Sequence, residues 1–212
     1  MMRGLVIGKF YPFHKGHAFL IRRAMDQSDE VTVLVCDRSD QIIPAEERGR
    51  WIKMAFPDVR VMIIPDIGHD DDSRMWADHT LRTLGFRSDL VFTSEDYGDA
   101  YARFMGAKHV LVDRARETVP ISGTKIRGDA YRYWRYLMPG AKARLAKRIV
   151  LVGPESTGKT TLVRKLAEHF RTAWVPEYGR FLSEGKSLSG TEWTTGEFEH
   201  IADVQNRLED EL

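Results

Sequence analysis

The stretch Gly8-Lys-Phe-Tyr-Pro-Phe-His-Lys-Gly-His17 decides how the first part of this chain is expected to fold. It follows the apolar run Leu5-Val-Ile7, which is typical of a buried strand, and it opens a segment whose apolar residues recur at helical spacing. The stretch is therefore expected to join the end of a strand to the N-terminus of a helix. That end of a helix presents free N–H groups and a partial positive charge, which together suit a phosphate group.

Two histidines, His14 and His17, lie three residues apart in this stretch, with Gly16 between them. Gly16 lacks the side chain that would block a close approach of the backbone to a ligand, and Pro12 stiffens the turn before the histidines. On spacing alone, two interpretations remain open. The histidines either bind a phosphate or serve as an ordinary helix cap and surface group.

Strand-like runs alternate with helical patterns through the first two thirds of the chain. The five strand candidates are apolar runs at residues 5–7, 31–36, 59–64, 90–93 and 110–112. Pro44 marks one helix start, Ser73 is expected to cap another helix, and Gly85 is expected to stop it. The alternation predicts an α/β fold with a doubly wound, Rossmann-like parallel sheet, which binds ligands at the carboxyl ends of its strands.

The composition describes a globular protein rather than a disordered one, because 42% of the residues are hydrophobic and 30% are charged. A formal net charge of +1 gives no electrostatic case for a nucleic-acid partner. No signal region precedes the first strand, no apolar run is long enough to span a bilayer, and the single cysteine, Cys36, falls in a predicted buried strand. We therefore expect a cytoplasmic chain without a membrane partner.

A second phosphate-binding pattern, Gly153-Pro-Glu-Ser-Thr-Gly-Lys-Thr160, completes the G-x-x-x-x-G-K-[ST] sequence of a P-loop. In such a loop the backbone N–H groups cradle the phosphates, Lys159 reaches the β- and γ-phosphate oxygens, and the Thr160 hydroxyl ligates Mg²⁺. The apolar run at residues 148–152 predicts a strand before the loop, and the pattern from residue 159 to about residue 170 predicts a helix after it. The expected nucleotide-binding residues are Gly153, Gly158, Lys159, Thr160 and Thr161.

These patterns divide the chain into two expected domains. Residues 1–140 form the first, residues 141–147 a short basic connector, and residues 148–212 the start of a P-loop domain. The second part supplies too few strands to close a sheet of this class, so we expect it to be cut short and prone to association or local disorder. The segment at residues 131–140, whose aromatic residues lie at positions 131–136, is expected to pack as a helix on the flank of the first domain; stacking of the aromatic residues on bases is the alternative.

Taken together, the ordered motifs resemble those of the bacterial family of bifunctional nicotinamide-nucleotide adenylyltransferases and ribosylnicotinamide kinases. Residues 8–17 are similar to the first adenylyltransferase signature, and Ile121-Ser-Gly-Thr-Lys-Ile-Arg127, which follows Asp113 and Arg116, is similar to the second. The P-loop and the sequence Pro176-Glu-Tyr-Gly-Arg180 resemble the kinase half. Family members can carry an N-terminal helix-turn-helix repressor domain, and we expect neither that domain nor the later kinase strands from this sequence.

The resemblance implies transfer of an adenylyl group from ATP to nicotinamide mononucleotide, which gives NAD and pyrophosphate. It assigns catalysis to His14, His17 and Arg127. It assigns ATP binding to the other signature residues, which are Gly8, Phe10, Gly16, Ser122, Thr124 and Lys125. Trp76 either offers an aromatic face to the cationic nicotinamide ring or belongs to the core of its helix. The acidic run that begins at Asp70 is expected to be a solvated approach to that helix.

In the second half, the resemblance places Glu177 and Arg180 near a nicotinamide riboside substrate, although a surface salt bridge would explain this pair as well. Mg²⁺ is the implied cofactor, ATP and the two nicotinamide compounds are the implied partners, and the oligomeric state is not predicted. The absent strands argue against kinase turnover. Two alternatives remain open: adenylyl transfer to another small phosphate acceptor, such as a pantetheine phosphate or a nicotinic-acid nucleotide, and a nucleotide-binding sensor without turnover.

Overall fold

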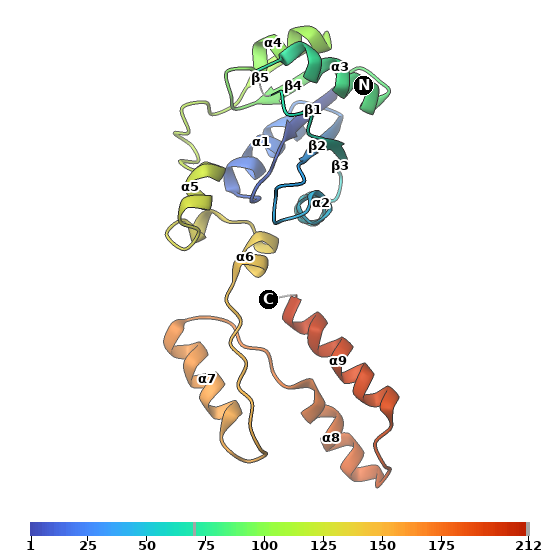
Figure 1. The fold of residues 1–212 in the computed structure, drawn as a ribbon, viewed down its shortest axis with the longest axis vertical. Coiled ribbons are helices and arrows are strands. Elements are labelled where there is room, and N and C mark those ends of the chain that lie inside the picture. The colour runs from blue at the N-terminus through green and yellow to red at the C-terminus, as the bar shows by residue number, and fades with distance from the viewer. Residues whose placement is uncertain (70, 211–212) are drawn as a thin grey trace. The chain divides into compact units, whose positions relative to one another are not determined.

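The computed structural model describes residues 1–69 and 71–210, and it divides the chain into two compact units, residues 1–145 and 146–212 (Figure 1). The first unit contains the sheet, and the described part of the second unit is helical. The helix α6 (Pro139–Leu145) is the last element of the first unit. A helix therefore occupies most of the residues that the sequence predicts as a basic connector.

The first unit is built on a five-stranded parallel sheet with β1 (Arg3–Gly8), β2 (Glu30–Asp37), β3 (Arg60–Pro65), β4 (Leu90–Thr93) and β5 (Lys108–Leu111). All five predicted strands are confirmed. The strand order is β3-β2-β1-β4-β5, so the direction of winding reverses between β1 and β4. In the central strand, Val6 pairs with Val33 on one side and Phe92 on the other. Sheets of this kind bind ligands at the carboxyl ends of the strands where the order reverses.

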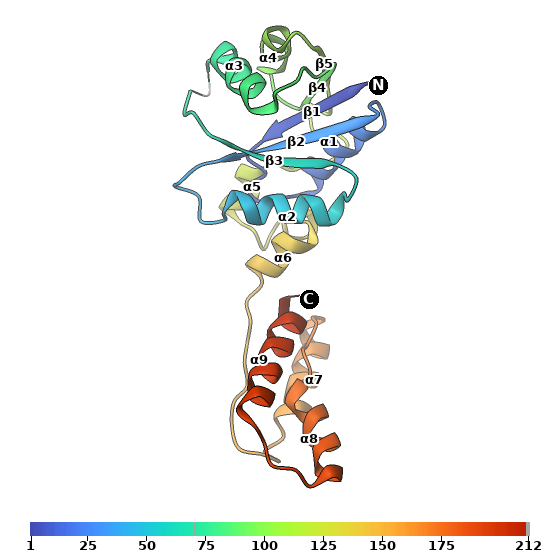
Figure 2. The same cartoon turned by 90° about the vertical axis from the view of Figure 1, so that its right-hand side faces the viewer.

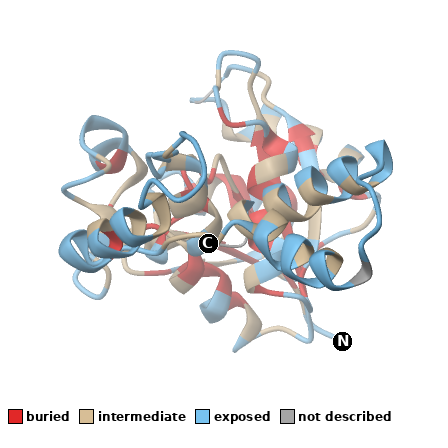
Figure 3. Cartoon of the chain, turned by 90° about the horizontal axis from the view of Figure 1, so that it is seen from below, coloured by how far each residue is buried: buried red, intermediate tan, exposed pale blue. Residues whose placement is uncertain are grey.

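Helices cover both faces of this sheet (Figure 2). The helices α1 (Lys15–Met25) and α2 (Ala45–Ala55) share a buried cluster with Val6 on one face, whereas α3 (Ser73–Leu84) and α4 (Gly98–Met105) share another with Leu5 and Ile7. Successive residues of a strand point to opposite faces, which explains why β1 is apolar at each of these positions. Along the helices, buried and exposed residues lie on different sides (Figure 3). The predicted doubly wound α/β fold is confirmed, and Cys36 is buried as expected.

Capping residues set where the helices begin and end. The helix α2 starts directly after Pro44, as predicted, and Gly85 ends α3 in the left-handed conformation, with a φ of 72°. The predicted cap of α3 is wrong by one position, because Asp72 accepts the hydrogen bond from Met75 N, at 2.8 Å, and Ser73 is the first helical residue. Aspartate and serine are equally good caps, so the sequence does not rank the two neighbours. The expectation for Asp70 lies outside the described residues.

Arg48 lies on the buried face of α2, and its side chain is fully buried. Its guanidinium donates hydrogen bonds to four backbone carbonyl groups, those of Lys9, Cys36, Ile43 and Pro44. Burial lowers the pKa of the guanidinium, and the carboxylate of Asp37, 3.8 Å away, favours its charged form. Arg48 therefore ties the chain after β1 to the end of β2 and the start of α2.

The aromatic segment at residues 131–136 packs on the first unit. Tyr133, Trp134 and Tyr136 are partly buried against the core cluster that includes α1 and α2. Tyr131 is exposed and stacks on Trp134, with 5.8 Å between the ring centroids. The packing interpretation is supported, although the regular structure here is a short 3-10 helix, Trp134–Tyr136, that covers half of the segment.

The described residues of the second unit form three helices, α7 (Lys159–Phe170), α8 (Tyr178–Ser189) and α9 (Thr195–Asp210). The helix predicted after the P-loop is confirmed. The strand predicted at residues 148–152 is wrong: no strand forms there, and the side chains of Ile149 and Val152 are exposed. A strand needs a neighbour that pairs its backbone groups, and residues 146–210 supply none. Of the residues described in this unit, Ala167 alone is buried.

The helices α8 and α9 contact each other through polar and apolar groups. The backbone N–H of Tyr178 donates to Gln205 Oε1, at 2.9 Å, and Lys186 pairs with the carboxylate of Glu197. Ile201 lies against the backbone at Gly179. These contacts hold the two helices together without a sheet beneath them. Across residues 1–69 and 71–210, no helix combines the length and the apolar character needed to cross a membrane.

Candidate functional site

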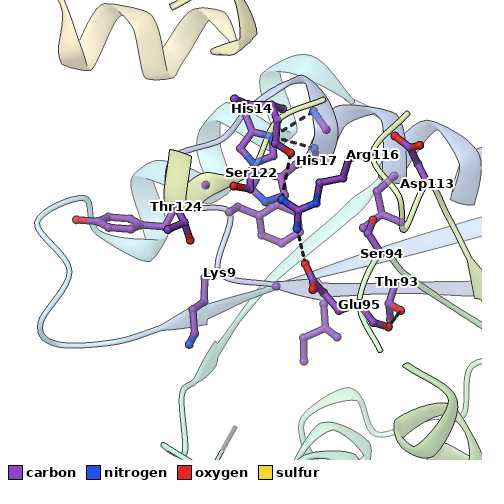
Figure 4. A pocket seen from close by; sticks show the side chains of 18 of the residues that line it. Lys9, His14, His17, Thr93, Ser94, Glu95, Asp113, Arg116, Ser122 and Thr124 are labelled. Carbon is purple, nitrogen blue, oxygen red and sulfur yellow. Dashed lines mark hydrogen bonds and ion pairs between the residues drawn. The ribbon is translucent and has the colours of Figure 1, made fainter. Parts of the chain in front are cut away.

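A pocket of about 460 Å³ opens at the carboxyl ends of β1 and β4, where the strand order reverses (Figure 4). It lies between the stretch that follows β1 and the loop that leads into α5 (Gly123–Gly128). The structure brings nearly all site residues predicted for the first domain into its wall, namely Gly8, Phe10, His14, Gly16, His17, Trp76, Ser122, Thr124 and Arg127. Lys125 is the exception, because its side chain is exposed and does not line the pocket.

His14 is both the cap of α1 and part of the pocket wall. Its Nδ1 atom accepts hydrogen bonds from the backbone N–H groups of Gly16, at 3.1 Å, and His17, at 3.3 Å. A ring nitrogen that accepts hydrogen bonds carries no proton, so the proton of the neutral imidazole is on Nε2. The buried Nε2 atom has no hydrogen-bond partner in the part of the chain that the structure describes. It is a donor that the protein leaves for a ligand.

His17 stacks on His14, with 3.6 Å between the ring centroids and 18° between the ring planes. Its other ring neighbours are aromatic: Phe13 is stacked at 6.3 Å, and Phe10 meets it edge-on at 5.0 Å. The buried Nδ1 atom of His17 also has no hydrogen-bond partner among the described residues. The two imidazoles therefore form a fixed pair in an aromatic frame, and each retains one nitrogen that the protein does not satisfy.

The surroundings of both imidazoles favour the neutral form. Burial, with help from the positive charges of Arg116 and Arg127, lowers the pKa of His14 from 6.5 to about 4. Burial is also the largest cause that holds the pKa of His17 well below 6.5, followed by repulsion from His14 and from the same two arginines. The pocket thus combines neutral N–H donors with permanently charged guanidinium groups. This combination suits a chain of phosphates.

The loop into α5 supplies the second half of the pocket wall. Ser122 caps this helix, because its Oγ atom accepts a hydrogen bond from Lys125 N at 3.2 Å. Arg127 donates to Tyr11 O, at 2.7 Å, and to Thr124 Oγ1, at 3.0 Å. These bonds fix the guanidinium and join the two signature stretches across 116 residues of sequence.

Two glycines permit the close approach of these two stretches. A side chain at Gly16 would come within 3.1 Å of the ring of His14 and would disturb the cap. A side chain at Gly123 would come within 2.8 Å of the backbone oxygen of Tyr11, which cannot move without breaking its bond to Arg127. The sequence identified Gly16 as a site residue, whereas the role of Gly123 becomes visible only in the folded chain.

Arg116 and Glu95 form a charged pair in the pocket wall (Figure 4). Arg116 Nη2 donates to Glu95 Oε1 at 2.8 Å, and Nη1 donates to the backbone oxygen of Ile121 at 3.3 Å. The sequence places Arg116 in a motif without indicating its role, and it gives no signal for Glu95. No pattern in the sequence marks Glu95, because its partner lies 21 residues away.

Asp113 shapes the turn that delivers Arg116. Its carboxylate accepts hydrogen bonds from the backbone N–H groups of Thr118 and Val119, each at 3.0 Å. Asp113 and Arg116 both have positive φ values, of 47° and 55°, which non-glycine residues adopt only when their surroundings enforce them. The L-V-D-x-x-R pattern before the second signature is the sequence signal for this turn.

Trp76 combines the two interpretations that the sequence left open. Its side chain is half-buried and packs against the core cluster that includes α3 and α4, and the same side chain lines the pocket. Its ring lies 6.0 Å from that of His79, which helps to fix its orientation. An aromatic surface held in this way suits a flat cationic ring.

The P-loop of the second unit adopts a turn closed by its own lysine. Gly153 and Gly158 have φ values of 155° and 82°, and α7 begins at Lys159. Lys159 Nζ donates to Gly153 O, at 2.7 Å, and to Pro154 O, at 2.6 Å. The ammonium group is thus satisfied by loop carbonyls at the place where a bound nucleotide would offer phosphate oxygens. Thr160 lies in the first turn of α7, next to Thr161.

Glu177 and Arg180 lie at the start of α8, where the backbone N–H of Arg180 donates to Glu177 O at 3.2 Å. The ion pairs found in the described part of the second unit join Arg148 to Glu209 and Asp210, and Lys186 to Glu197. A salt bridge between the Glu177 and Arg180 side chains is not among them. The alternative explanation of this pair as a surface salt bridge therefore has no support in the structure.

Comparison with known proteins places this site in a family. The cytidylyltransferase-like model matches residues 5–129, a span that holds the sheet except for the first two residues of β1 and includes both signature stretches. The chain belongs to the cytidylyltransferase-like family. Residues 148–212 match the model of an AAA domain, which covers the P-loop and the three helices of the second unit.

Curated relatives of this cytidylyltransferase-like chain include three adenylyltransferase or NAD-related proteins. It is 34% identical over 200 residues to the trifunctional NAD biosynthesis/regulator protein NadR of Escherichia coli (strain K12), a match that covers 84% of this chain and 48% of that protein. It is 26% identical over 150 residues to a nicotinamide-nucleotide adenylyltransferase of Methanococcus vannielii, covering 65% and 84%. It is 29% identical over 134 residues to a phosphopantetheine adenylyltransferase of Cutibacterium acnes, covering 61% and 85%. The chain spans about half the length of the NadR proteins it matches.

Solved structures share the fold. A NadR protein in complex with NR has a TM-score of 0.75 at 21% sequence identity, and the match covers 98% of this cytidylyltransferase-like chain and 64% of that one. A NadR protein in complex with NAD and AMP-PNP has a TM-score of 0.67 at 24% identity, covering 88% and 58%. At these identities the likeness establishes the fold, which agrees with the sheet described above.

Proposed function

We propose that the first unit transfers an adenylyl group from ATP to nicotinamide mononucleotide and releases pyrophosphate, which makes NAD. The observation that carries this proposal is the stacked pair of His14 and His17, held neutral beside Arg127 in one pocket at the reversal of the strand order. The similarity to NadR and to nicotinamide-nucleotide adenylyltransferases supports the choice of acceptor.

In this reaction an oxygen of the acceptor's 5′-phosphate attacks the α-phosphorus of ATP. A P–O bond forms there as the bond to the bridging oxygen of the β-phosphate breaks, and pyrophosphate leaves with that electron pair. No covalent intermediate with the protein is needed. The protein then accelerates the reaction by positioning the two phosphates and by stabilising the charge that develops on them.

The two histidines supply donors to the α-phosphate under this proposal. The helix cap keeps the His14 proton on Nε2, so this N–H is available without any rearrangement when charge grows on the α-phosphate oxygens. His17 is held against it by ring stacking and adds a second imidazole. Because the pKa of each ring is lowered, both are weak bases that donate hydrogen bonds to the developing charge without taking a proton from the acceptor phosphate.

Under this proposal, the second signature stretch binds the leaving pyrophosphate. Arg127 offers a guanidinium whose position is fixed by Tyr11 O and Thr124 Oγ1, and Arg116 adds a second cation to the same pocket. A guanidinium fits two phosphate oxygens at once, which a lysine does not. Ser122 and Thr124 complete this wall, and the backbone N–H of Lys125 fixes the Ser122 side chain by donating to its Oγ atom.

Mg²⁺ fits this site as an ion bound to the phosphates of ATP. Among the described residues, no group of three or more His, Cys, Asp or Glu side chains is placed to hold a metal ion. The two carboxylates of the wall are engaged, Glu95 with Arg116 and Asp113 with backbone N–H groups. We therefore expect Mg²⁺ to enter with ATP, where it offsets charge on the phosphate oxygens. In the second unit, Thr160 would ligate it.

The acceptor has a second candidate, which the similarity to a phosphopantetheine adenylyltransferase favours. Trp76 argues for the nicotinamide nucleotide, because a half-buried indole in the pocket wall stabilises a pyridinium ring by about 1–2 kcal/mol but gains nothing comparable from an aliphatic pantetheine. A nicotinic-acid nucleotide carries the same ring with an added carboxylate, and only a competition assay separates it from the amide.

For the second unit we propose nucleotide binding by residues 153–161, with Glu177 and Arg180 facing a nicotinamide riboside. Binding requires Lys159 to leave the carbonyl groups of Gly153 and Pro154 and turn to the phosphates. A NadR protein of the same fold has been solved in complex with NR, which supports the riboside as a ligand. A nucleotide sensor without turnover is favoured by the unpaired segment at residues 148–152.

Product analysis by chromatography tests these proposals. The purified chain is incubated with Mg-ATP and either nicotinamide mononucleotide, nicotinic-acid mononucleotide, phosphopantetheine or nicotinamide riboside. We expect NAD and pyrophosphate in equal amounts from nicotinamide mononucleotide. Adenylylated pantetheine alone would replace the proposed acceptor, and no adenylylated product from any of them would overturn the transferase itself. NAD from the riboside would show that the second unit phosphorylates, whereas an ATP site that is lost in Lys159→Ala, without NAD from the riboside, would identify the sensor.

A further inference from the structure

A chain of hydrogen bonds runs beside the pocket from the end of β4 to the surface of α4. Asp99 Oδ1 lies 2.5 Å from His109 Nδ1, and His109 Nε2 lies 2.9 Å from Thr93 Oγ1. The Thr93 hydroxyl also donates to the backbone oxygen of Glu95 at 3.2 Å. These four residues come from β4, the loop after it, α4 and β5. The adenylyl-transfer proposal uses none of these bonds.

The direction of one of these bonds follows from counting protons. The carboxylate of Asp99 can only accept, so His109 Nδ1 donates to it. The Thr93 hydroxyl bonds both to His109 Nε2, at 2.9 Å, and to the Glu95 carbonyl, at 3.2 Å. His109 therefore links Asp99 at one ring nitrogen to Thr93 at the other.

The surrounding backbone is built around this contact. Thr93 is 2% exposed, and the backbone of Gly98, the first residue of α4, packs directly on the bond. A side chain at Gly98 would lie 2.2 Å from His109 Nε2 and 2.3 Å from Thr93 Oγ1. The backbone N–H of Gly98 also donates to the Glu95 carbonyl, at 3.3 Å. The bond and the glycine together fix the turn that carries Glu95.

The same turn faces the pocket. Thr93, Ser94 and Glu95 line it, and the Glu95 carboxylate holds Arg116, which also lines it (Figure 4). A displacement of the turn would therefore move the carboxylate that orients a pocket guanidinium. His109 does not line the pocket itself.

We propose that His109 is a positioning residue for phosphate binding, which acts through Thr93 and Glu95 on the guanidinium of Arg116. The inference rests on the proposed function only in naming ATP and pyrophosphate as the ligands. It predicts that losing the hydrogen bond between His109 and Thr93 weakens binding of the β- and γ-phosphates and leaves the binding of the acceptor unchanged.

Two substitutions of His109 separate its two hydrogen bonds. In His109→Gln the side-chain amide can take the place of Nε2 and still reach Thr93, whereas in His109→Asn it takes the place of Nδ1 and reaches only Asp99. We expect His109→Asn to raise the KM for ATP and the Kd for pyrophosphate about tenfold, and His109→Gln to stay within about threefold of the parent. Thr93→Val, which keeps the shape and removes the hydroxyl, should match His109→Asn. Lys108→Asn, an exposed change on the same strand, is the control.

A mutant cycle with Arg116→Ala decides whether the effect passes through Arg116. In that background His109→Asn should change neither the KM for ATP nor the Kd for pyrophosphate further. Equal behaviour of the Asn and Gln variants, a parallel rise in the KM for nicotinamide mononucleotide, or full additivity with Arg116→Ala would overturn the proposal. Pyrophosphate binding measured by calorimetry needs no turnover. If the parent makes no NAD, the proposed function fails while the binding ratios still decide the role of His109.

Discussion

The two phosphate motifs of this chain lie in very different surroundings. The stretch at residues 8–17 leaves a central strand that pairs on both sides, and its histidines are held by a helix cap, two phenylalanine rings and each other. The P-loop follows a segment that pairs with no strand in the described structure, and its lysine bonds to the loop itself. A helix follows both motifs, as their sequences predict.

The difference shows which part of a site a motif specifies by itself. Glycines and a following helix are enough to form a turn with free N–H groups, and the P-loop has these. Holding a side chain ready for a ligand requires packing from residues distant in sequence. Arg127 reaches Tyr11 across 116 residues, whereas the contacts of Lys159 span no more than six.

Substitutions in the first pocket are expected to have the largest effect. His17→Ala and Arg127→Ala should each slow NAD formation about a hundredfold or more, because each removes about 3–4 kcal/mol of charge stabilisation from the transition state. Steady-state kinetics measures the effect, with circular dichroism to show that the fold is kept. Arg132→Ala, an exposed arginine five residues after Arg127, is the matched control and should leave the rate unchanged. Near-normal rates in both variants would show that the pocket is not the catalytic site.

The next largest effect is expected at Arg48, whose hydrogen bonds hold the backbone near the first pocket. Arg48→Met should lower the free energy of unfolding by about 3 kcal/mol, because it leaves buried carbonyl groups without a donor. Urea denaturation measures the change. Arg50→Met, an exposed substitution on the same helix, should change the free energy by less than about 0.5 kcal/mol. Similar values for the two variants would mean that the buried guanidinium contributes no more than a surface one.

The dependence of stability on pH tests the histidine pair that the first unit buries. The folded pKa of His14 is about 4 against an ordinary 6.5, so between these values the unfolded chain binds more protons. Stability should therefore fall as the pH drops below 6.5, by about 2 kcal/mol between pH 7 and pH 5 from His14, and burial of His17 acts in the same direction.

Other groups also titrate in this range, so the measurement compares two proteins. Urea denaturation of the parent and of His14→Asn is followed at pH 7 and pH 5. Asparagine keeps a side-chain oxygen that can cap α1, and it does not titrate. The variant should lose less stability than the parent over this interval. An equal loss in both would show that His14 is not held neutral in the folded state.

The smallest effect is expected in the P-loop. Lys159→Ala should leave NAD formation within about twofold and stability within about 0.5 kcal/mol, because its contacts are exposed and local. Calorimetry should show one ATP site fewer than in the parent. A large loss of NAD formation would mean that the second unit takes part in adenylyl transfer.

Most of the first unit could be predicted because its signals are local. Apolar runs of strand length, separated by helical patterns, identify β1 to β5, and the two signature stretches identify the pocket wall. The choice between Asp72 and Ser73 as a cap failed because both side chains suit that position. Glu95 could not be found, because its contact with Arg116 exists only once β4 and the turn after β5 are side by side.

The prediction for residues 148–152 failed for a related reason. Ile149, Val150 and Val152 have the composition of a buried strand, but a strand is a property of a pair of segments. Composition reports the tendency of one segment and says nothing of its partner. The same sequence signal therefore succeeded in β1, which has two neighbours, and failed at residue 148, which has none in the described structure.

The strand order has a consequence for how the chain is made. A ribosome releases β1 and β2 early, but the other edge of β1 pairs with β4, whose first residue, Leu90, is synthesised much later. During that interval the nascent chain exposes an apolar strand edge of the kind that pairs with other chains. The pocket closes later still, when Arg127 reaches Tyr11. Folding during synthesis must therefore protect β1 first, and only a chain extended past residue 127 can form both walls of the pocket.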